Sequence, residues 1–291
     1  MSATETIKGL IRKNATVFDL VRAIQAATHR WSGLARMNFD VADQLCAFAP
    51  NSMGPMRASA AVALQSARRT FPLLVSLAQA SGKRLPQPTT IAGVYPKCDA
   101  LADTAEFASL MNRYGSDKAD GRHDYHRFYA PLLATKRRDP LRLFEIGLGT
   151  NNTDVLSNMG SRGRPGASLR AFRDFLPNAQ IFGADVDRRV WFREDRITTA
   201  FVDQRDAGTF SDLPFEPGFD IIIDDGLHSP EANLETLLFA LRALAPGGSL
   251  VIEDIREEAV SIWQIVSLVL PAALDPVIVS ARNGFLFKIG A

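Results

Sequence analysis

The 291-residue sequence has little cysteine and almost no net charge. Its two cysteines, Cys46 and Cys98, form no CxxC pair, so we expect reduced thiols rather than a disulfide framework. With 33 basic and 32 acidic residues the formal net charge is +1. The two signs are interleaved, which argues against a nucleic-acid or anionic-lipid partner.

Long apolar segments are also absent. The first 14 residues, MSATETIKGLIRKN, lack the apolar core of a signal peptide. The most apolar stretch, SIWQIVSLVLPAALDPVIV, is interrupted by Gln264, Pro271, Asp275 and Pro276, and is too broken to span a bilayer. We therefore expect a soluble, cytoplasmic protein with no membrane span.

Two composition regimes predict two domains. Residues 1 to about 80 are rich in alanine and leucine at helical spacing, and residues 81–99, with glycine and three prolines, have the composition of a linker. From about residue 100, short apolar runs alternate with amphipathic helical stretches. The sequence therefore predicts a helical N-terminal domain and linker over residues 1–99, followed by an α/β domain over residues 100–291.

The order of elements in the second domain indicates a Rossmann-like fold. Alternating strands and helices imply right-handed crossovers and a mostly parallel sheet with helices on both faces. The last two apolar runs, PVIVSAR and GFLFKIG, are separated only at Asn283, so they must form a terminal antiparallel hairpin. This is the layout of class I S-adenosylmethionine (SAM) methyltransferases.

A glycine loop follows the first strand of this domain. In FEIGLGTNN, Gly147 and Gly149 allow close approach to a ligand, and Glu145 adds a carboxylate. A dinucleotide-binding loop is disfavoured because Asn152 replaces the third glycine and the next strand-end acid lies well beyond the usual interval. A cationic sulfonium cofactor suits an acid-flanked loop better than a pyrophosphate does, so SAM is favoured over NAD. The alternative is a turn without a ligand.

Acids at the next two strand ends are candidates for holding an adenosyl group. Asp185 can accept both ribose hydroxyls, and Asp187 is a close alternative. Asp203 and Gln204 follow the third strand, where they can meet the adenine amino group. Asp203 serves equally well as a helix cap or turn residue.

Five polar residues follow the fourth and fifth strands. FDIIIDDGLHSPE provides Asp224, Asp225 and His228, and SLVIEDI provides Glu253 and Asp254. Neighbouring strand ends would bring these carboxylates together, and their repulsion calls for a cation. Oxygen ligands favour magnesium or another hard divalent ion over zinc.

Purely structural interpretations exist for this segment too. Asp224 can belong to the cofactor site or hydrogen-bond the sheet backbone. Ser229 and Pro230 have the pattern of a helix N-terminus, which would make His228 a loop residue before the cap.

Residues 110–290 resemble the magnesium-dependent sugar O-methyltransferases of macrolide biosynthesis, the mycinamicin-type enzymes. The motifs are RYGSDKADGRHDYHRFY (Arg113–Tyr129), FEIGLG, and the pair IDDGLH and IEDI with their mutual spacing. Two departures stand out. Leu227 occupies a position that is often serine in the family, and the loop after FEIGLG is unusually long.

The resemblance implies roles for specific residues. Asp225, Glu253 and Asp254 would bind the metal, and His228 would be the general base. Residues 114–118 would cap the cofactor, and the candidates there are Tyr114, Ser116 and Lys118.

The activity that the resemblance implies is methyl transfer from SAM to a sugar hydroxyl of a small molecule or glycan. The alternatives are a catechol-like diol acceptor and a non-catalytic SAM-binding or scaffold protein. We also expect a homo-oligomer. His123 and His126, with their tyrosine neighbours, predict either a lid or a helix that presents aromatic rings to the core.

Overall fold

The computed structural model describes residues 44–51, 55–97 and 102–290. Residues 1–43 of the predicted helical region, and Cys98, lie outside these ranges. Contacts divide the chain into two compact units, Met1–Leu74 and Val75–Ala291. Helix α3 (Met56–Ala80) crosses the boundary between them and confirms helical structure in the alanine-rich region. We describe the second unit, which contains the sheet, by itself.

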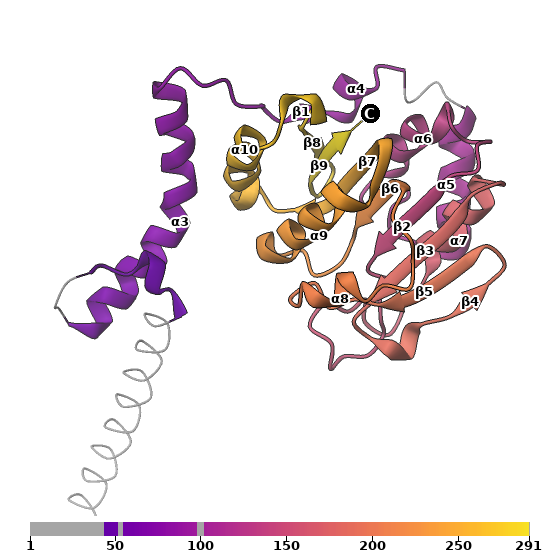
Figure 1. The fold of residues 1–291 in the computed structure, drawn as a ribbon, viewed down its shortest axis with the longest axis horizontal. Helices are drawn as coiled ribbons and strands as arrows, with labels where there is room; N and C mark the ends of the chain where they lie inside the picture. The colour runs from indigo at the N-terminus through magenta and orange to yellow at the C-terminus, as the bar shows by residue number, and fades with distance from the viewer. Residues whose placement is uncertain (1–43, 52–54, 98–101, 291) are drawn as a thin grey trace, which may run out of the picture. The chain divides into compact units, whose positions relative to one another are not determined.

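The sheet has nine strands in the described residues, in the order β1-β8-β9-β7-β6-β2-β3-β5-β4 (Figure 1). They are β1 (Thr89–Thr90), β2 (Arg142–Ile146), β3 (Gln180–Asp185), β4 (Arg193–Glu194), β5 (Ile197–Phe201), β6 (Phe219–Asp224), β7 (Leu244–Ile255), β8 (Val277–Ala281) and β9 (Gly284–Gly290). Every pairing is parallel except those of β4 with β5 and of β9 with β7 and β8. The predicted parallel sheet with a terminal hairpin is therefore confirmed.

Helices cover both faces of the sheet. They are α4 (Ile91–Val94), α5 (Ala102–Tyr114), α6 (His126–Ala134), α7 (Ala167–Phe175), α8 (Gly208–Ser211), α9 (Pro230–Ala243) and α10 (Val260–Val269). Residues of β6 alternate between two cores: Ile221 and Ile223 pack with α5, α6 and α7, whereas Ile222 packs with α9 and α10. This alternation is the two-residue period of a strand buried on both faces.

Local signals in the sequence explain where key elements begin. Ser229 caps α9 by accepting a hydrogen bond from the amide of Ala232, and Pro230 occupies its first turn, as predicted. Thr89 and Thr90, within the expected linker, instead pair with Val279 and Ser280 of β8. The linker sequence thus adds a short strand to the edge of the sheet.

No helix in the described part of the chain is both long and apolar enough to cross a membrane.

A close backbone contact joins the loops after β2 and β6. Gly147 has a φ of +96°, and a Cβ at this position would lie 2.0 Å from the backbone oxygen of Asp225. The amide of Asp225 donates to the carbonyl of Ile146 at 2.9 Å. Gly147 is therefore required for the approach of the chain's own backbone, as well as for its positive φ.

We expect Gly147→Ala to lower the free energy of unfolding by about 2–4 kcal/mol, through left-handed strain plus overpacking. Gly247→Ala is the matched control, since Gly247 has a φ of +77° with nothing within 4 Å of an added Cβ. It should cost only about 1–2 kcal/mol. Equal losses in a urea denaturation series would contradict the close contact.

Candidate active site

A cavity of about 880 Å³ opens at the carboxyl ends of the central parallel strands. Most of the residues predicted from sequence line it. They are Ser116, Gly147, Gly149, Asp185, Asp187, Asp203, Gln204, Asp225, His228 and Asp254. The other five candidates are not among its lining residues, namely Tyr114, Lys118, Glu145, Asp224 and Glu253.

The two acids that end β3 brace the glycine loop. Asp185 accepts hydrogen bonds from the amides of Leu148 at 2.9 Å and Asp187 at 2.8 Å. Asp187 accepts from the hydroxyl of Thr150 at 2.6 Å and from Arg189 Nε at 2.7 Å. Burial raises the pKa of Asp185, whereas the hydrogen bond from Arg189 holds the pKa of Asp187 below its usual value. Both carboxylates thus lie beside the glycine loop.

Asp224 has an internal role. It is fully buried and accepts hydrogen bonds from the side-chain amides of Gln204 and Asn233, both at 2.9 Å. The side-chain oxygen of Gln204 accepts from the amide of Leu227 at 2.8 Å. These contacts fix the IDDGLH turn, so both ends of the Gln204 amide are engaged within the protein rather than free to meet an adenine.

Asp203 pairs with a neighbouring arginine. Its carboxylate accepts from the backbone amide and the guanidinium of Arg205, each at 3.0 Å. Asp203 therefore has the turn role that was one of its two predicted interpretations, at the margin of the cavity.

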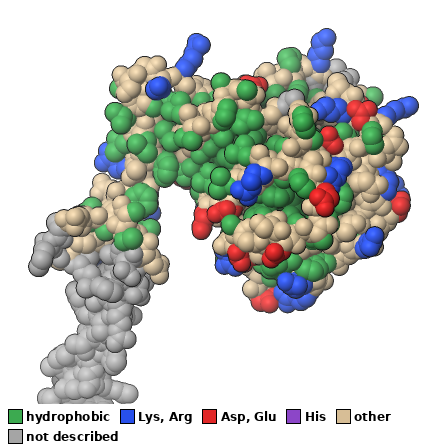
Figure 2. Space-filling model, in the orientation of Figure 1, with side chains coloured by type: hydrophobic (Ala, Val, Ile, Leu, Met, Phe, Trp, Pro, Cys, Tyr) green, Lys and Arg blue, Asp and Glu red, His purple; other side chains and the backbone are tan. Residues whose placement is uncertain are grey.

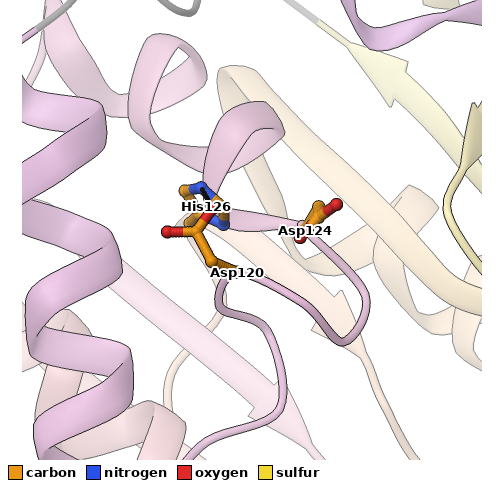
Figure 3. A group of neighbouring side chains, drawn as sticks. All are labelled: Asp120, Asp124 and His126. Carbon is orange, nitrogen blue, oxygen red and sulfur yellow. Dashed lines mark ion pairs between the residues drawn. The ribbon is translucent and has the colours of Figure 1, made fainter.

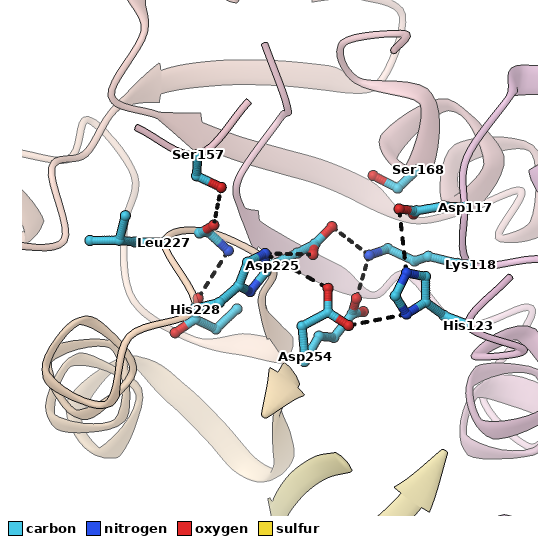
Figure 4. A network of polar contacts seen from close by, with 12 residues as sticks. Asp117, Lys118, His123, Ser157, Ser168, Asp225, Leu227, His228 and Asp254 are labelled. Carbon is cyan, nitrogen blue, oxygen red and sulfur yellow. Dashed lines mark hydrogen bonds and ion pairs between the residues drawn. The ribbon is translucent and has the colours of Figure 1, made fainter. Parts of the chain in front are cut away.

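Lys118 lies under the cavity floor at the centre of a buried charge cluster (Figure 4). Its Nζ is 2.6 Å from Asp225, 2.5 Å from Glu253 and 3.5 Å from Glu145. Burial lowers the pKa of Lys118, but the three carboxylates outweigh burial and raise it well above its usual value. The predicted cap residue is thus an internal cation in this structure.

Glu253 faces inward, toward Lys118. Its second oxygen accepts a hydrogen bond from the hydroxyl of Tyr129, so both oxygens have partners, and its side chain is 1% exposed. Glu145 is likewise buried and accepts from the hydroxyl of Ser168 at 2.6 Å. Neither carboxylate is among the groups that line the cavity.

Asp225, His228 and Asp254 form an open group. Their ligand atoms all lie within 4.8 Å of one another, and the imidazole Nε2 is 3.8 Å from Asp225 and 3.7 Å from Asp254. The buried Nδ1 of His228 has no hydrogen-bond partner among the described residues. Two carboxylates and an imidazole can together bind a hard divalent cation. Alternatively, the carboxylates bind the cation and the imidazole beside it accepts a proton.

His228 and Asp254 also share an unusual backbone. Their φ angles are +57° and +55°, in the left-handed region that non-glycine residues rarely adopt. Strain of this kind persists where the surrounding structure enforces it, and it is concentrated at functional sites. Here it turns both side chains toward the same space.

The segment between α5 and α6 orients these groups. Tyr125 donates a hydrogen bond to Asp254 at 2.5 Å, and His123 Nδ1 lies 3.2 Å from the same carboxylate. Burial raises the pKa of Asp254, yet the contacts with His123 and Tyr125 outweigh burial and hold it well below its usual value. From the sequence, His123 and its tyrosine neighbours are expected to form a lid or a core-facing helix, but the sequence does not predict their contacts with Asp254.

Tyr114, the first residue of the predicted cap, points elsewhere. Its hydroxyl donates to Asp174 of α7 at 2.5 Å, which fixes α5 against α7. Ser116, two residues later, does line the cavity.

A second acidic group, Asp120, Asp124 and His126, lies nearby (Figure 3). Each of its carboxylates already has an arginine neighbour: Arg127 is 3.7 Å from Asp120, and Arg282 is 3.4 Å from Asp124. No member of this second group lines the cavity, whereas Asp225, His228 and Asp254 all do, so the Asp225 group is the better candidate.

The charge cluster predicts the effect of removing its cation. In metal-free buffer, Lys118→Met should lower the free energy of unfolding by about 3–5 kcal/mol, because three carboxylates lose their buried counter-charge. The control, Lys136→Met, removes an ammonium that contacts the Gly247 carbonyl at the surface, and should change stability by less than about 0.5 kcal/mol. Similar small changes in both variants, measured by guanidinium denaturation, would disprove the assigned role.

Comparisons with known proteins find similar methyltransferases. No family model matches the chain. It is 33% identical over 158 residues to the 8-demethyl-8-(2-methoxy-alpha-L-rhamnosyl)-tetracenomycin-C 3'-O-methyltransferase of Streptomyces olivaceus, covering 54% of this chain and 38% of that protein. It is 33% identical over 151 residues to the mycinamicin VI 2''-O-methyltransferase of Micromonospora griseorubida, covering 51% and 36%. The chain thus spans well under half the length of these relatives.

A solved structure has a similar fold. MycE methyltransferase from the mycinamycin biosynthetic pathway, in complex with Mg and SAH, superimposes with a TM-score of 0.52 at 25% identity, covering 64% of this chain and 54% of that one. The resemblance predicted from the motifs is confirmed. The chain therefore has the class I SAM-dependent methyltransferase fold and is similar in sequence to the macrolide sugar O-methyltransferases.

Proposed function

We propose that this protein transfers a methyl group from SAM to a sugar hydroxyl of a small molecule or glycan, with the help of a divalent metal. The observation that carries the proposal is the convergence of the glycine loop, Asp225, His228 and Asp254 on one cavity. The relatives support it, because their names describe O-methylation of a rhamnosyl tetracenomycin and of mycinamicin VI.

The cofactor would lie along the ends of β2 and β3. Gly147 and Gly149 offer backbone without side chains on the cavity wall. Asp185 is our choice for the ribose hydroxyls over Asp187, because Asp187 already accepts from Thr150, Asn152 and Arg189. The complex of MycE with SAH supports this cofactor class.

Asp225 and Asp254 would hold the metal ion, with Glu253 as the proposed third ligand. The donor set fits a hard cation, and MycE was crystallised with Mg. Glu253 could join only by sharing or exchanging its contact with Lys118. The ion would supply charge stabilisation for the acceptor oxygen.

His228 is the proposed base. The acceptor hydroxyl would lose its proton to this imidazole while its oxygen bonds to the SAM methyl carbon, and S-adenosylhomocysteine would leave as the carbon–sulfur bond breaks. An imidazole suits this task because it can be neutral at physiological pH. The carboxylates of Asp225 and Asp254, 3.8 and 3.7 Å away, would stabilise the imidazolium formed.

The proposal is tested by incubating the protein with SAM and magnesium against a panel of glycosides, glycan extracts and catechols. The products are scored by mass for an added methyl group. Transfer to a glycoside that stops on chelation and returns with magnesium is the expected result. Transfer to catechols alone would favour the diol alternative. SAM binding without any transfer would leave a non-catalytic SAM-binding role.

We expect His228→Asn to reduce kcat by roughly 10²–10⁴-fold, the usual contribution of a general base. Asparagine tolerates the left-handed backbone at this position, so the loss reports the imidazole rather than strain. The affinities for SAM and for the metal, measured by calorimetry, should stay within about threefold of wild type. A collapse of metal affinity would instead assign His228 as a ligand.

Self-association is a further part of the proposal. Apolar side chains gather over α10 and the neighbouring α9 (Figure 2), where Leu238, Leu241 and Val269 are exposed. Exposed apolar patches favour a partner surface, and a second copy is the simplest one. Sedimentation equilibrium should give a dimer or larger species for the wild type and a smaller mass for Val269→Asp. A wild-type monomer at high concentration would contradict this.

Cytoplasmic location and a domain division near residue 99 stay predictions.

A further inference from the structure

Five arginines line the cavity, and two of them have a carboxylate partner within the described ranges. Arg189 pairs with Asp187, and Arg205 pairs with Asp203. The guanidinium groups of the other three have no ion pair or hydrogen bond with any residue that the structure describes. These are Arg122, Arg162 and Arg164, which we call the arginine triad, and all three are exposed at the rim of the cavity.

The arginine triad comes from two loops that meet across the cavity. Arg122 lies between α5 and α6, and the other two belong to the long loop between β2 and α7. The loops touch where Arg164 packs on Gly115, since a Cβ on that glycine would lie 2.8 Å from the arginine Cδ. Ser157, on the same long loop, donates a hydrogen bond to the carbonyl of Gly226 at 3.2 Å. The loop that carries two of the arginines therefore contacts the turn that carries the proposed base.

The cavity lining also contains seven aspartates, but among the described residues none of them forms an ion pair with the arginine triad. SAM carries one carboxylate on its methionine tail, which can pair with one guanidinium. At least two guanidinium groups of the arginine triad then remain available in a cavity that must also admit the acceptor. Guanidinium groups bind carboxylate and phosphate groups in a bidentate manner, and this geometry gives specificity as well as affinity.

We propose that the acceptor is an anionic sugar, whose carboxylate or phosphate binds the arginine triad while its hydroxyl faces His228. This inference rests on the proposed function and narrows its substrate class. It also gives the unusually long loop between β2 and α7 a purpose, because that loop supplies two of the three cations.

The experiment measures binding without turnover. The protein, loaded with S-adenosylhomocysteine and magnesium, is titrated calorimetrically with methyl glucuronide, glucose 6-phosphate and the neutral methyl glucoside. We expect at least one acidic probe to bind about tenfold or more tightly than the neutral one, and the preference to weaken with salt. The two acidic probes distinguish a carboxylate from a phosphate.

A double variant, Arg162→Gln with Arg164→Gln, should abolish that preference, and its affinity for S-adenosylhomocysteine is measured alongside so that lost acceptor binding is told apart from lost cofactor binding. Arg193→Gln, an exposed arginine of β4 outside the cavity lining, is the matched control and should keep the preference. Equal binding of all probes, no binding of any, or a loss confined to the cofactor would overturn the inference.

The two proposals fail separately. Methylation of neutral glycosides with no acidic preference would remove this inference and leave the proposed function. Acidic preference without methyl transfer to any acceptor would remove the proposed function and leave only an anion-binding site at the arginine triad.

Discussion

The Lys118 ammonium contacts the buried carboxylates of Glu145 and Glu253 and the carboxylate of Asp225, which lines the cavity. The cavity floor depends on this interaction. Removing four charged groups from water is costly unless they neutralise one another at close range. Lys118 lies 107 positions before Asp225 and 135 positions before Glu253 in the sequence. Its contacts therefore hold the segment before α6 against the ends of β6 and β7. This cation favours the ionised form of Asp225, whereas His123 and Tyr125 favour the ionised form of Asp254.

The same segment sets the direction of each acid. Tyr129 and Lys118 hold Glu253 inward, whereas Tyr125 and His123 steady Asp254 at the cavity. Adjacent residues at the end of one strand thereby acquire opposite roles. Their difference follows from strand geometry, since neighbouring side chains point to opposite faces, together with the left-handed turn at Asp254.

Much of the fold was predictable from the sequence, because two-residue and helical periodicities are local properties. The runs RLFEI, QIFGAD and FDIIID all form strands, and Ser229 begins α9 as expected. The sequence could also predict which residues meet at the sheet edge, because parallel strands end together. It could not predict that Lys118 would lie beneath the carboxylates rather than above the cofactor.

The predictions that differ from the structure do so because non-local contacts decide them. Whether a strand-end acid faces the cavity or the interior depends on partners far away in sequence, as with Asp224, which Gln204 and Asn233 hold in the core. Thr89 and Thr90 joined the sheet for a similar reason, since β8 offered an unpaired edge to a segment with linker composition. Non-local pairing of this kind leaves no mark in the local pattern.

The most direct test of the account is the position of a bound divalent ion. Crystals grown with Mn²⁺ and S-adenosylhomocysteine would locate the metal by anomalous scattering. The account predicts a single strong peak in the cavity, within bonding distance of Asp225 and Asp254. A peak at Asp120, Asp124 and His126 instead, or no peak in the cavity with the cofactor bound, would contradict it.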